Sequence, residues 1–292
     1  MTSDVTLIGF GEAGQAFAGA EGWRGKARVY DKLTDNPDTV TAKEADYHRA
    51  GVTGVPDLGL AVVNADLTLS LVTASQALLV AQSAAAWLNR ASLFLDMNSV
   101  APGTKQASAA AVEAAGGRYV DVAIMSPVLP ARLVVPLLLS GTEASAAARE
   151  LTKLGFSDVR VIGSRVGDAS AIKMIRSVIV KGLEALTAEA MLAADAAGVT
   201  EEVLASLDAS EKAQPWVKRA EYTLDRMIAH GLRRADEMEE AAKTLQDLGV
   251  EPAMTEGIVR RQREIGALHL GRPATGLSGK IDQIAGRKAN AA

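Results

Sequence analysis

Three glycines near the start of the chain have the spacing of a dinucleotide-binding turn. Gly9, Gly11 and Gly14 form a G-x-G-x-x-G pattern between the strand-like stretch Val5–Ile8 and the helix-forming residues 15–18. In such a turn the first glycine makes the tight bend, the second lets a pyrophosphate approach the backbone, and the third lets the helix pack closely on the strand. The N–H groups at the helix N-terminus then favour phosphates. The expected pyrophosphate contacts are Gly9, Phe10, Gly11, Glu12, Ala13 and Gly14.

A second strand-like stretch, residues 28–31, ends in an acid. The carboxylate of Asp31 is placed to accept hydrogen bonds from the ribose hydroxyls of an adenosine, and it repels a 2′-phosphate. The expected cofactor is therefore NAD, although the neighbouring Lys32 weakens the preference and leaves NADP as the alternative. The competing interpretation is a glycine-rich turn with an unrelated surface aspartate.

A lysine on a strongly apolar helix is the second candidate for chemistry. Residues 169–197 form one long helical run with apolar side chains on nearly all sides, which is typical of a buried helix. Lys173, Ser177 and Lys181 share a polar stripe, with Arg176 beside it. If Lys173 faces a substrate, desolvation would lower its pKa, and the amine could exchange a proton with a substrate hydroxyl while hydride moves to nicotinamide. The alternative is that Lys173 extends to solvent or pairs with an acid.

Strand-like and helix-like stretches alternate as far as residue 165. Strands are expected at 67–72, 93–96, 118–122, 134–139 and 159–162, and helices at 58–64, 74–88, 102–115 and 144–154, whereas residues 32–54 are polar and irregular. This alternation predicts an α/β fold with a doubly wound (Rossmann), mainly parallel sheet. After residue 166 we expect only helices, at 169–197, 201–213, 216–229, 233–248 and 254–268, followed by a polar tail. The expected domains are a dinucleotide-binding domain, 1–165, and an all-helical substrate and dimerisation domain, 166–292, with a long inter-domain helix.

Composition excludes several kinds of site. The 292 residues are 48% hydrophobic and 23% charged, with a net charge of -4 and no cysteine, so disulfides and thiolate chemistry are excluded. The charge gives no indication of a nucleic-acid or membrane partner. His48, His230 and His269 lack ligand spacing, so no metal is expected. Without a signal-peptide pattern, the expected location is cytoplasmic.

The residues that carry chemistry are similar to those of a known family. The glycine turn, Asp31 and Gly167-x5-Lys173 resemble the β-hydroxyacid dehydrogenases of the 6-phosphogluconate dehydrogenase-like superfamily. Residues 173–177, 181–186 and 233–238 are similar to the branch with the "phosphogluconate dehydrogenase, NAD-binding, putative-like" C-terminal domain. The resemblance covers roughly residues 1–268. It implies that Lys173 is catalytic, that a hydroxyl and a carbonyl are interconverted on a small carboxylated substrate, and that the helical domains form a homodimer.

The same resemblance indicates further site residues. Val72 and Thr73 end the strand whose following loop contacts the cofactor in the family, and Asn98 and Ser99 lie near the place where nicotinamide and substrate meet. Asp121–Pro127 stands where relatives carry a substrate-binding D-A-P-V-S-G-G, with only the aspartate in register and a serine one position late. The expected cofactor contacts are therefore Val72, Thr73 and Asn98, and the expected substrate contacts are Ser99, Ser126 and Pro127.

Two departures from the family alter the expected substrate site. Ser177 replaces the asparagine that relatives carry four residues after the lysine. Arg233, Arg234 and Asp236 stand in the region of a K-D-L motif. We expect Arg176, Ser177 and Arg234 to contact substrate, because arginine binds a carboxylate bidentately.

Two other functions remain open. Imine reduction uses the same scaffold, although relatives that perform it generally lack the lysine. The second alternative is a non-catalytic nucleotide-binding or interaction protein, because fold does not imply function.

Overall fold

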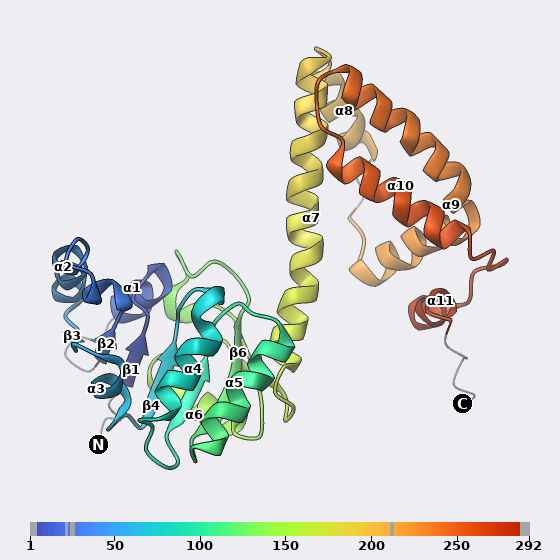
Figure 1. Ribbon diagram of the computed structural model, residues 1–292. Coiled ribbons are helices and arrows are strands. Elements are labelled where there is room, and N and C mark those ends of the chain that lie inside the picture. Colours follow the sequence, from blue (N-terminus) through green and yellow to red (C-terminus); the bar gives the residue numbers. More distant parts are fainter. Residues whose placement is uncertain (1–4, 21–22, 24–26, 211–212, 287–292) are drawn as a thin grey trace. The chain divides into compact units, whose positions relative to one another are not determined.

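The computed structural model describes residues 5–20, 23, 27–210 and 213–286, apart from a few side chains on the long helices. The chain divides into two compact units, Met1–Val178 and Ile179–Ala292. The division falls inside the long helix α7 (Asp168–Ala196) rather than near residue 165. Figure 1 shows the strands and helices of both units.

An eight-stranded sheet forms the centre of the first unit. Its strands are β1 (Val5–Ile8), β2 (Ala27–Tyr30), β3 (Thr53–Gly54), β4 (Leu67–Ser70), β5 (Leu93–Asp96), β6 (Arg118–Ile124), β7 (Leu137–Ser140) and β8 (Val159–Gly163). They lie in the order β3-β2-β1-β4-β5-β6-β7-β8. All neighbouring strands run parallel except β6 and β7, which run antiparallel. The predicted doubly wound, mainly parallel sheet is confirmed.

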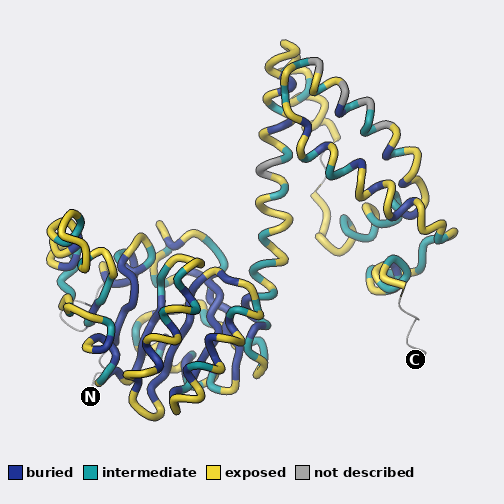
Figure 2. Tube along the Cα trace, viewed as in Figure 1, coloured by how far each residue is buried: buried dark blue, intermediate teal, exposed yellow. Residues whose placement is uncertain are grey.

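Helices of the first unit connect these strands, and the sheet is its buried centre (Figure 2). Consecutive β5 residues Phe94 and Leu95 are fully buried in different apolar clusters, as expected when both faces of a sheet are covered. The helices, with short 3-10 turns labelled η, are α1 (Glu12–Ala18), η1 (Lys32–Asp35), α2 (Val40–Ala50), α3 (Leu58–Val62), η2 (Ala74–Gln76), α4 (Ala77–Ala85), α5 (Pro102–Ala114), η3 (Arg132–Val134), α6 (Ala144–Lys153) and the start of α7.

The prediction that residues 32–54 are irregular was wrong, because they contain η1, α2 and β3. Two side chains one turn apart hold α2 on the glycine turn. The ring of Tyr47 packs edge-on against Phe10, with 5.2 Å between centroids. The ammonium of Lys43 donates to the Phe10 carbonyl oxygen at 3.0 Å and to Asp46 at 3.1 Å. The two contacts with Phe10 join residues far apart in the sequence, so the polar local sequence gives no sign of them.

The strand order places the site. β1 lies between β2 and β4, so the chain crosses from one side of the sheet to the other at β1 and β4. Ligands of doubly wound sheets bind outside the carboxyl ends of the strands at such a switch point. Three segments follow strands there: the glycine turn after β1, residues 71–73 after β4, and residues 97–99 after β5.

The second unit contains the rest of α7, with α8 (Thr200–Ser210), α9 (Trp216–Asp247), α10 (Ala253–Gly266) and α11 (Gly276–Ile284). Its described residues include no strand, as predicted. Two expected helices, 216–229 and 233–248, form the single helix α9. A Cβ atom at Gly231 would lie 2.5 Å from the Gln262 carbonyl oxygen, so this glycine serves the close packing of α9 on α10 and does not end a helix. Helix α11 lies in the polar tail, where the sequence predicted no helix.

The expectation that the long helix is buried was wrong for one chain. Ile175 and Val178 on α7 are 70% and 71% exposed. Within the described residues, the structure has no helix with the length and apolar character needed to cross a membrane.

Glu189 on α7 holds the first turn of α10. Its carboxylate accepts hydrogen bonds from the backbone N–H of Met254 at 2.7 Å and of Thr255 at 2.9 Å, and from the Thr255 hydroxyl at 2.6 Å. Burial by itself would raise the pKa of Glu189, but these hydrogen bonds outweigh it and lower the pKa below its ordinary value. A lowered folded-state pKa contributes stability above the unfolded value of 4.5, and that stability is lost as pH falls through the folded-state pKa.

We expect Glu189→Gln to lower the free energy of unfolding at pH 7 by about 1–2 kcal/mol, because a charged helix cap is lost. The further loss of stability on acidification below pH 4.5 should become smaller than in the wild type. Chemical denaturation at both pH values, followed by circular dichroism, measures this. Glu44→Gln, an exposed acid in the middle of α2, is the control and should change neither value. Equal acid sensitivity of Glu189→Gln and the wild type would contradict the assignment.

Candidate functional site

The glycine turn between β1 and α1 has the shape of a dinucleotide-binding turn. Gly9 has φ +91°, and a Cβ atom there would lie 2.6 Å from the Leu71 carbonyl oxygen, so only glycine fits. A Cβ atom at Gly14 would lie 2.8 Å from the Gly9 carbonyl oxygen, which is the close packing expected of the third glycine. At Gly11 a Cβ atom would meet nothing within 4 Å. The backbone at Gly11 therefore borders open space, and a pyrophosphate fits this cradle.

A cleft of about 290 Å³ lies beside the turn, and we call it the Asp31 cleft. Its lining includes Gly9, Gly11, Tyr30, Asp31, Lys32 and Val72. The Asp31 carboxylate accepts a hydrogen bond from the Phe10 N–H at 2.6 Å and from the Leu33 N–H at 3.0 Å. The acid is thus held at the end of β2 beside the glycine turn, where the sequence placed the adenosine ribose. The Phe10 ring is buried in the core, so Phe10 offers the turn only its backbone.

A second cleft, of about 490 Å³, is lined by residues from five separate segments of the chain, and we call it the Lys173 cleft. Predicted site residues on its wall are Glu12, Ala13, Val72, Thr73, Asn98, Ser99, Ser126, Pro127 and Lys173. Leu71, Val72 and Thr73 line both clefts, so the two clefts are neighbours on either side of the loop after β4. An elongated ligand that follows the glycine turn can therefore extend from one cleft into the other.

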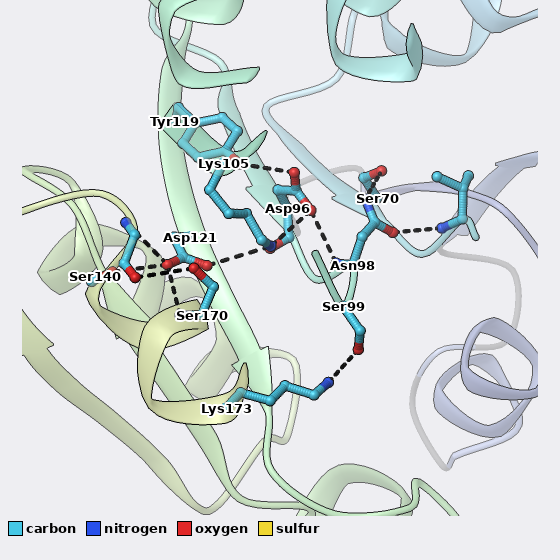
Figure 3. Close-up of polar contacts among 12 residues, drawn as sticks. Ser70, Asp96, Asn98, Ser99, Lys105, Tyr119, Asp121, Ser140, Ser170 and Lys173 are labelled. Atoms are coloured by element: carbon cyan, nitrogen blue, oxygen red, sulfur yellow. Dashed lines mark hydrogen bonds and ion pairs between the residues drawn. The ribbon is translucent and has the colours of Figure 1, made fainter. Parts of the chain in front are cut away.

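Lys173 lies on the second turn of α7 and reaches into its cleft (Figure 3). Its ammonium donates a hydrogen bond to the Ser99 hydroxyl at 2.5 Å. Lys173 is half-buried. Its side chain is therefore neither enclosed by the protein nor extended into solvent. Lys173 and the loop after β5 therefore meet within one unit of the chain.

Asn98 ties together the loops after β4 and β5. Its side-chain carbonyl accepts from the Val72 N–H at 2.7 Å, and its amide donates to the Ser70 hydroxyl at 3.0 Å (Figure 3). The Asn98 backbone N–H donates to Asp96 at 3.0 Å. Asn98 is 4% exposed, so its side chain shapes the cleft wall through these bonds. This arrangement fixes the backbone that carries Ser99.

Behind this wall lies a cluster of buried charges that the sequence reasoning missed (Figure 3). Lys105 on α5 is fully buried and pairs with Asp96 at 2.9 Å and with Asp121 at 3.4 Å. The Tyr119 hydroxyl donates to Asp96 at 2.8 Å. Burial raises the pKa of Tyr119, and the neighbouring Asp96 and then Asp121 raise it further, so the phenol remains a neutral donor. The available signal was an aspartate in each of two strand-like stretches, together with a lysine in an alanine-rich helix.

Asp121 has a different role from the one its motif implied. Relatives use that segment for substrate, but this carboxylate is fully buried. It accepts hydrogen bonds from the Ser140 hydroxyl at 3.2 Å and from the backbone N–H groups of Gly167 at 3.2 Å and Ser170 at 3.0 Å. Asp121 therefore holds the N-terminus of α7. Ser126, five residues later, does lie on the wall of the Lys173 cleft.

Three expected substrate residues are not on that wall. Arg176 and Ser177 follow Lys173 on α7 without lining the cleft within the described part of the first unit. Arg234 lies on α9 in the second unit, and its Nε atom is buried. Their contact with substrate stays a prediction. Among the described residues, no group of three or more histidines and acids is arranged to hold a metal ion.

The chain matches one family model and is similar to several solved structures. Residues 194–265 match the family described as "Domain of unknown function (DUF1932)". A conserved hypothetical protein from Sinorhizobium meliloti 1021 is 36% identical, with 99% of this chain and 97% of that chain covered and a TM-score of 0.61. The conserved protein MTH1747, whose structure reveals similarity with 3-hydroxyacid dehydrogenases, is 30% identical, with 90% and 96% covered and a TM-score of 0.56.

Solved reductases share the fold at lower identity. An imine reductase from Myxococcus stipitatus in complex with NADP+ is 18% identical, with 89% of this chain and 93% of that chain covered and a TM-score of 0.70. A variant of that reductase was solved in complex with NAD+ and has a TM-score of 0.72. At this identity the likeness concerns the fold alone.

Proposed function

Because this chain belongs to the 6-phosphogluconate dehydrogenase-like NAD-binding family, in the branch with a C-terminal DUF1932 domain, we propose that it is an NAD(P)-dependent oxidoreductase. Its reaction interconverts a hydroxyl and a carbonyl on a small carboxylated substrate. The observation that carries the proposal is the bond between the Lys173 ammonium and the Ser99 hydroxyl, on a cleft wall that adjoins the glycine turn.

The residues of the two clefts fit a dinucleotide. Gly11 leaves room for the pyrophosphate, α1 directs its N-terminus there, and Asp31 is placed for the adenosine ribose. Val72 and Thr73 line the passage toward Asn98, where the nicotinamide end belongs. The solved reductases that share the fold hold NADP+ and NAD+ in their crystals, which supports a nicotinamide cofactor here. A nicotinamide cofactor held by these residues would supply the hydride acceptor for the carbinol carbon.

Lys173 handles the proton in this reaction. In the oxidative direction the neutral amine takes the hydroxyl proton and becomes the ammonium, while the C–O bond becomes a carbonyl; reduction reverses both transfers. General acid–base help of this kind contributes about 10² to 10⁴ in rate. The Ser99 hydroxyl accepts a hydrogen bond from this amine and would orient it toward the substrate oxygen. Ser126 and Pro127 border the space left for the rest of the substrate.

Imine reduction is the second candidate, because the imine reductase fold matches most of this chain. A panel of hydroxyacids with NAD+ or NADP+, followed by absorbance of the reduced nicotinamide, tests the first proposal. A panel of ketones plus amines with NADH or NADPH tests the second. Turnover in the first panel that is absent from Lys173→Met supports alcohol chemistry. Tight cofactor binding with no turnover in either panel would contradict both candidates and support a nucleotide-binding protein.

Asp31→Ala is expected to lower the ratio of kcat/KM for NAD over NADP by about tenfold to a hundredfold. The lost carboxylate would form a charged hydrogen bond worth about 1.5–3 kcal/mol with the ribose, and its repulsion of a 2′-phosphate disappears as well. Asp38→Ala, an exposed acid outside the Asp31 cleft, is the control. Because both cofactors are measured on one variant, a general loss of stability cancels in the ratio. An unchanged ratio means that the ribose is not at Asp31.

We also propose that a second copy of this chain covers the exposed apolar side chains of α7. Ile175, Val178 and Leu183 are at least half exposed in one chain, and a helix with several large exposed apolar side chains is typical of an interface. Light scattering should give twice the chain mass of 30.4 kDa at micromolar concentration. A mass of one chain would contradict the homodimer. The cytoplasmic location stays a prediction.

A further inference from the structure

The buried ammonium of Lys105 lies between the two segments that carry the Lys173–Ser99 pair. It donates to the Asp96 carboxylate at 2.9 Å and to the Asp96 carbonyl oxygen at 2.5 Å, and it lies 3.4 Å from the Asp121 carboxylate (Figure 3). All three side chains are 0% exposed. One cation therefore joins the end of β5 to the middle of β6 out of contact with water.

The first arm of this cluster leads to Ser99. Asp96 accepts the Asn98 backbone N–H at 3.0 Å, and the Asn98 side chain bonds both Val72 and Ser70. Ser99 follows directly, so its backbone position depends on the turn that Asp96 holds. Displacement of Asp96 would move the Ser99 hydroxyl.

The second arm leads to Lys173. Asp121 accepts N–H groups from Gly167 and Ser170 at the start of α7. Lys173 lies three residues after Ser170, one helical turn further along the same face. The carboxylate that pairs with Lys105 thus also sets where the first turns of α7 sit against β6.

The charges of the cluster depend on one another. One ammonium faces two carboxylates, and the second negative charge is stabilised by the N-terminus of α7. A buried ion cluster of this kind is a poor source of stability, because desolvation opposes the attraction between the charges and apolar residues of similar volume would serve as well. The arrangement is better explained by what it orients.

We propose that Lys105 is a positioning residue that sets the distance between the Lys173 amine and the Ser99 hydroxyl through the Asp96 and Asp121 arms. The catalytic part of this inference rests on the proposed function. The positions of the Lys173 amine and the Ser99 hydroxyl can be tested without turnover. Lys105 lies on α5, a helix outside both clefts. A residue outside the clefts would thus control the position of the Lys173 amine.

The test measures the Lys173 amine directly. The wild type, Ser99→Ala and Lys105→Met are labelled with acetic anhydride from pH 7 to 11, and Lys173 acetylation is quantified by peptide mass spectrometry, with Lys153 as the internal reference. Ser99→Ala defines the result when the pair is lost. Since the hydroxyl accepts a bond from the ammonium and favours that form, its removal should move the labelling midpoint of Lys173 to lower pH.

Lys105→Met also removes a positive charge, which by itself moves the labelling midpoint of Lys173 to higher pH. The comparison is therefore between Lys105→Met and the double variant Lys105→Met/Ser99→Ala: loss of Ser99 should shift the Lys173 midpoint by less than half as much as it does in the wild type, while the profile at Lys153 stays unchanged. Under turnover conditions we expect kcat to fall at least tenfold, with the KM for the nicotinamide cofactor within twofold of the wild type. A folded Lys105→Met in which Ser99→Ala shifts the Lys173 midpoint as much as in the wild type overturns the inference. If turnover is absent from the wild type, the proposed function fails while the labelling result still decides this inference.

Asp121→Asn covers the case in which Lys105→Met does not fold. It leaves Lys105 and Asp96 as a balanced pair and removes only the charge that holds α7. Loss of this charge alone moves the Lys173 midpoint but leaves the effect of Ser99→Ala unchanged. If the second arm positions Lys173, Ser99→Ala should again shift the midpoint by less than half as much in the Asp121→Asn background. If Ser99→Ala has its full wild-type effect there, the second arm does not position Lys173 and the proposal is wrong.

Discussion

Lys173→Ala is expected to lower kcat by about 10² to 10⁴ in either direction, because the substrate oxygen loses its proton donor and acceptor. The nicotinamide cofactor should bind within about twofold of its wild-type affinity, since Asp31 and the glycine turn hold the other end of the dinucleotide. Lys173 lines the Lys173 cleft and is not on the wall of the Asp31 cleft. Measurement of kcat by absorbance, with cofactor affinity from fluorescence titration, separates the two effects.

Two further variants sharpen this result. Lys173→Arg keeps the positive charge, but arginine does not deprotonate in proteins, so it should remain inactive as a base. Lys153→Ala removes an exposed lysine on α6 that pairs only with Glu150 among the described residues, and it should keep wild-type kcat. Activity of Lys173→Ala within threefold of the wild type would exclude the lysine from the chemistry.

Gly11→Val is expected to weaken nicotinamide cofactor binding by about tenfold to a hundredfold without unfolding the chain. A side chain at this position would occupy the open space that borders the turn. It would block backbone N–H groups from the pyrophosphate, and each charged hydrogen bond lost is worth about 1.5–3 kcal/mol. Since nothing in the protein lies within 4 Å of the added Cβ, the fold itself is not crowded.

Gly103 provides a matched control for this experiment. A Cβ atom there also meets nothing within 4 Å, but Gly103 lies in the first turn of α5 and lines neither cleft. Gly103→Val should bind the cofactor as the wild type does. Isothermal titration with NAD+ and NADP+, together with thermal melting, gives both affinity and stability. Wild-type affinity in a folded Gly11→Val would remove the glycine turn from cofactor binding.

Two elements show where local sequence misleads. Helix α2 has few apolar residues, yet it forms because Tyr47 and Lys43 contact the glycine turn, far away in the sequence. Helix α9 continues through Gly231, where a break was expected, because the missing side chain lets it approach Gly266 of α10. In both cases a tertiary contact decided the structure of a segment whose own propensity was weak.

The sequence by itself determined the mainly parallel sheet, the glycine turn, the place of Asp31 and the helix that carries Lys173. These follow from hydrophobic periodicity and from the conformations that only glycine adopts, which are local properties of the chain.

Only the tertiary structure decided how the side chains of separate strands and helices meet. The Lys105 cluster joins α5, β5, β6 and the start of α7, and it makes Asp121 a buried support of that helix. Such a cluster depends on strand register and helix packing, because a shift of one residue would direct each strand side chain to the opposite face of the sheet. No spacing along the chain encodes that meeting, so it emerges only when the sheet is assembled.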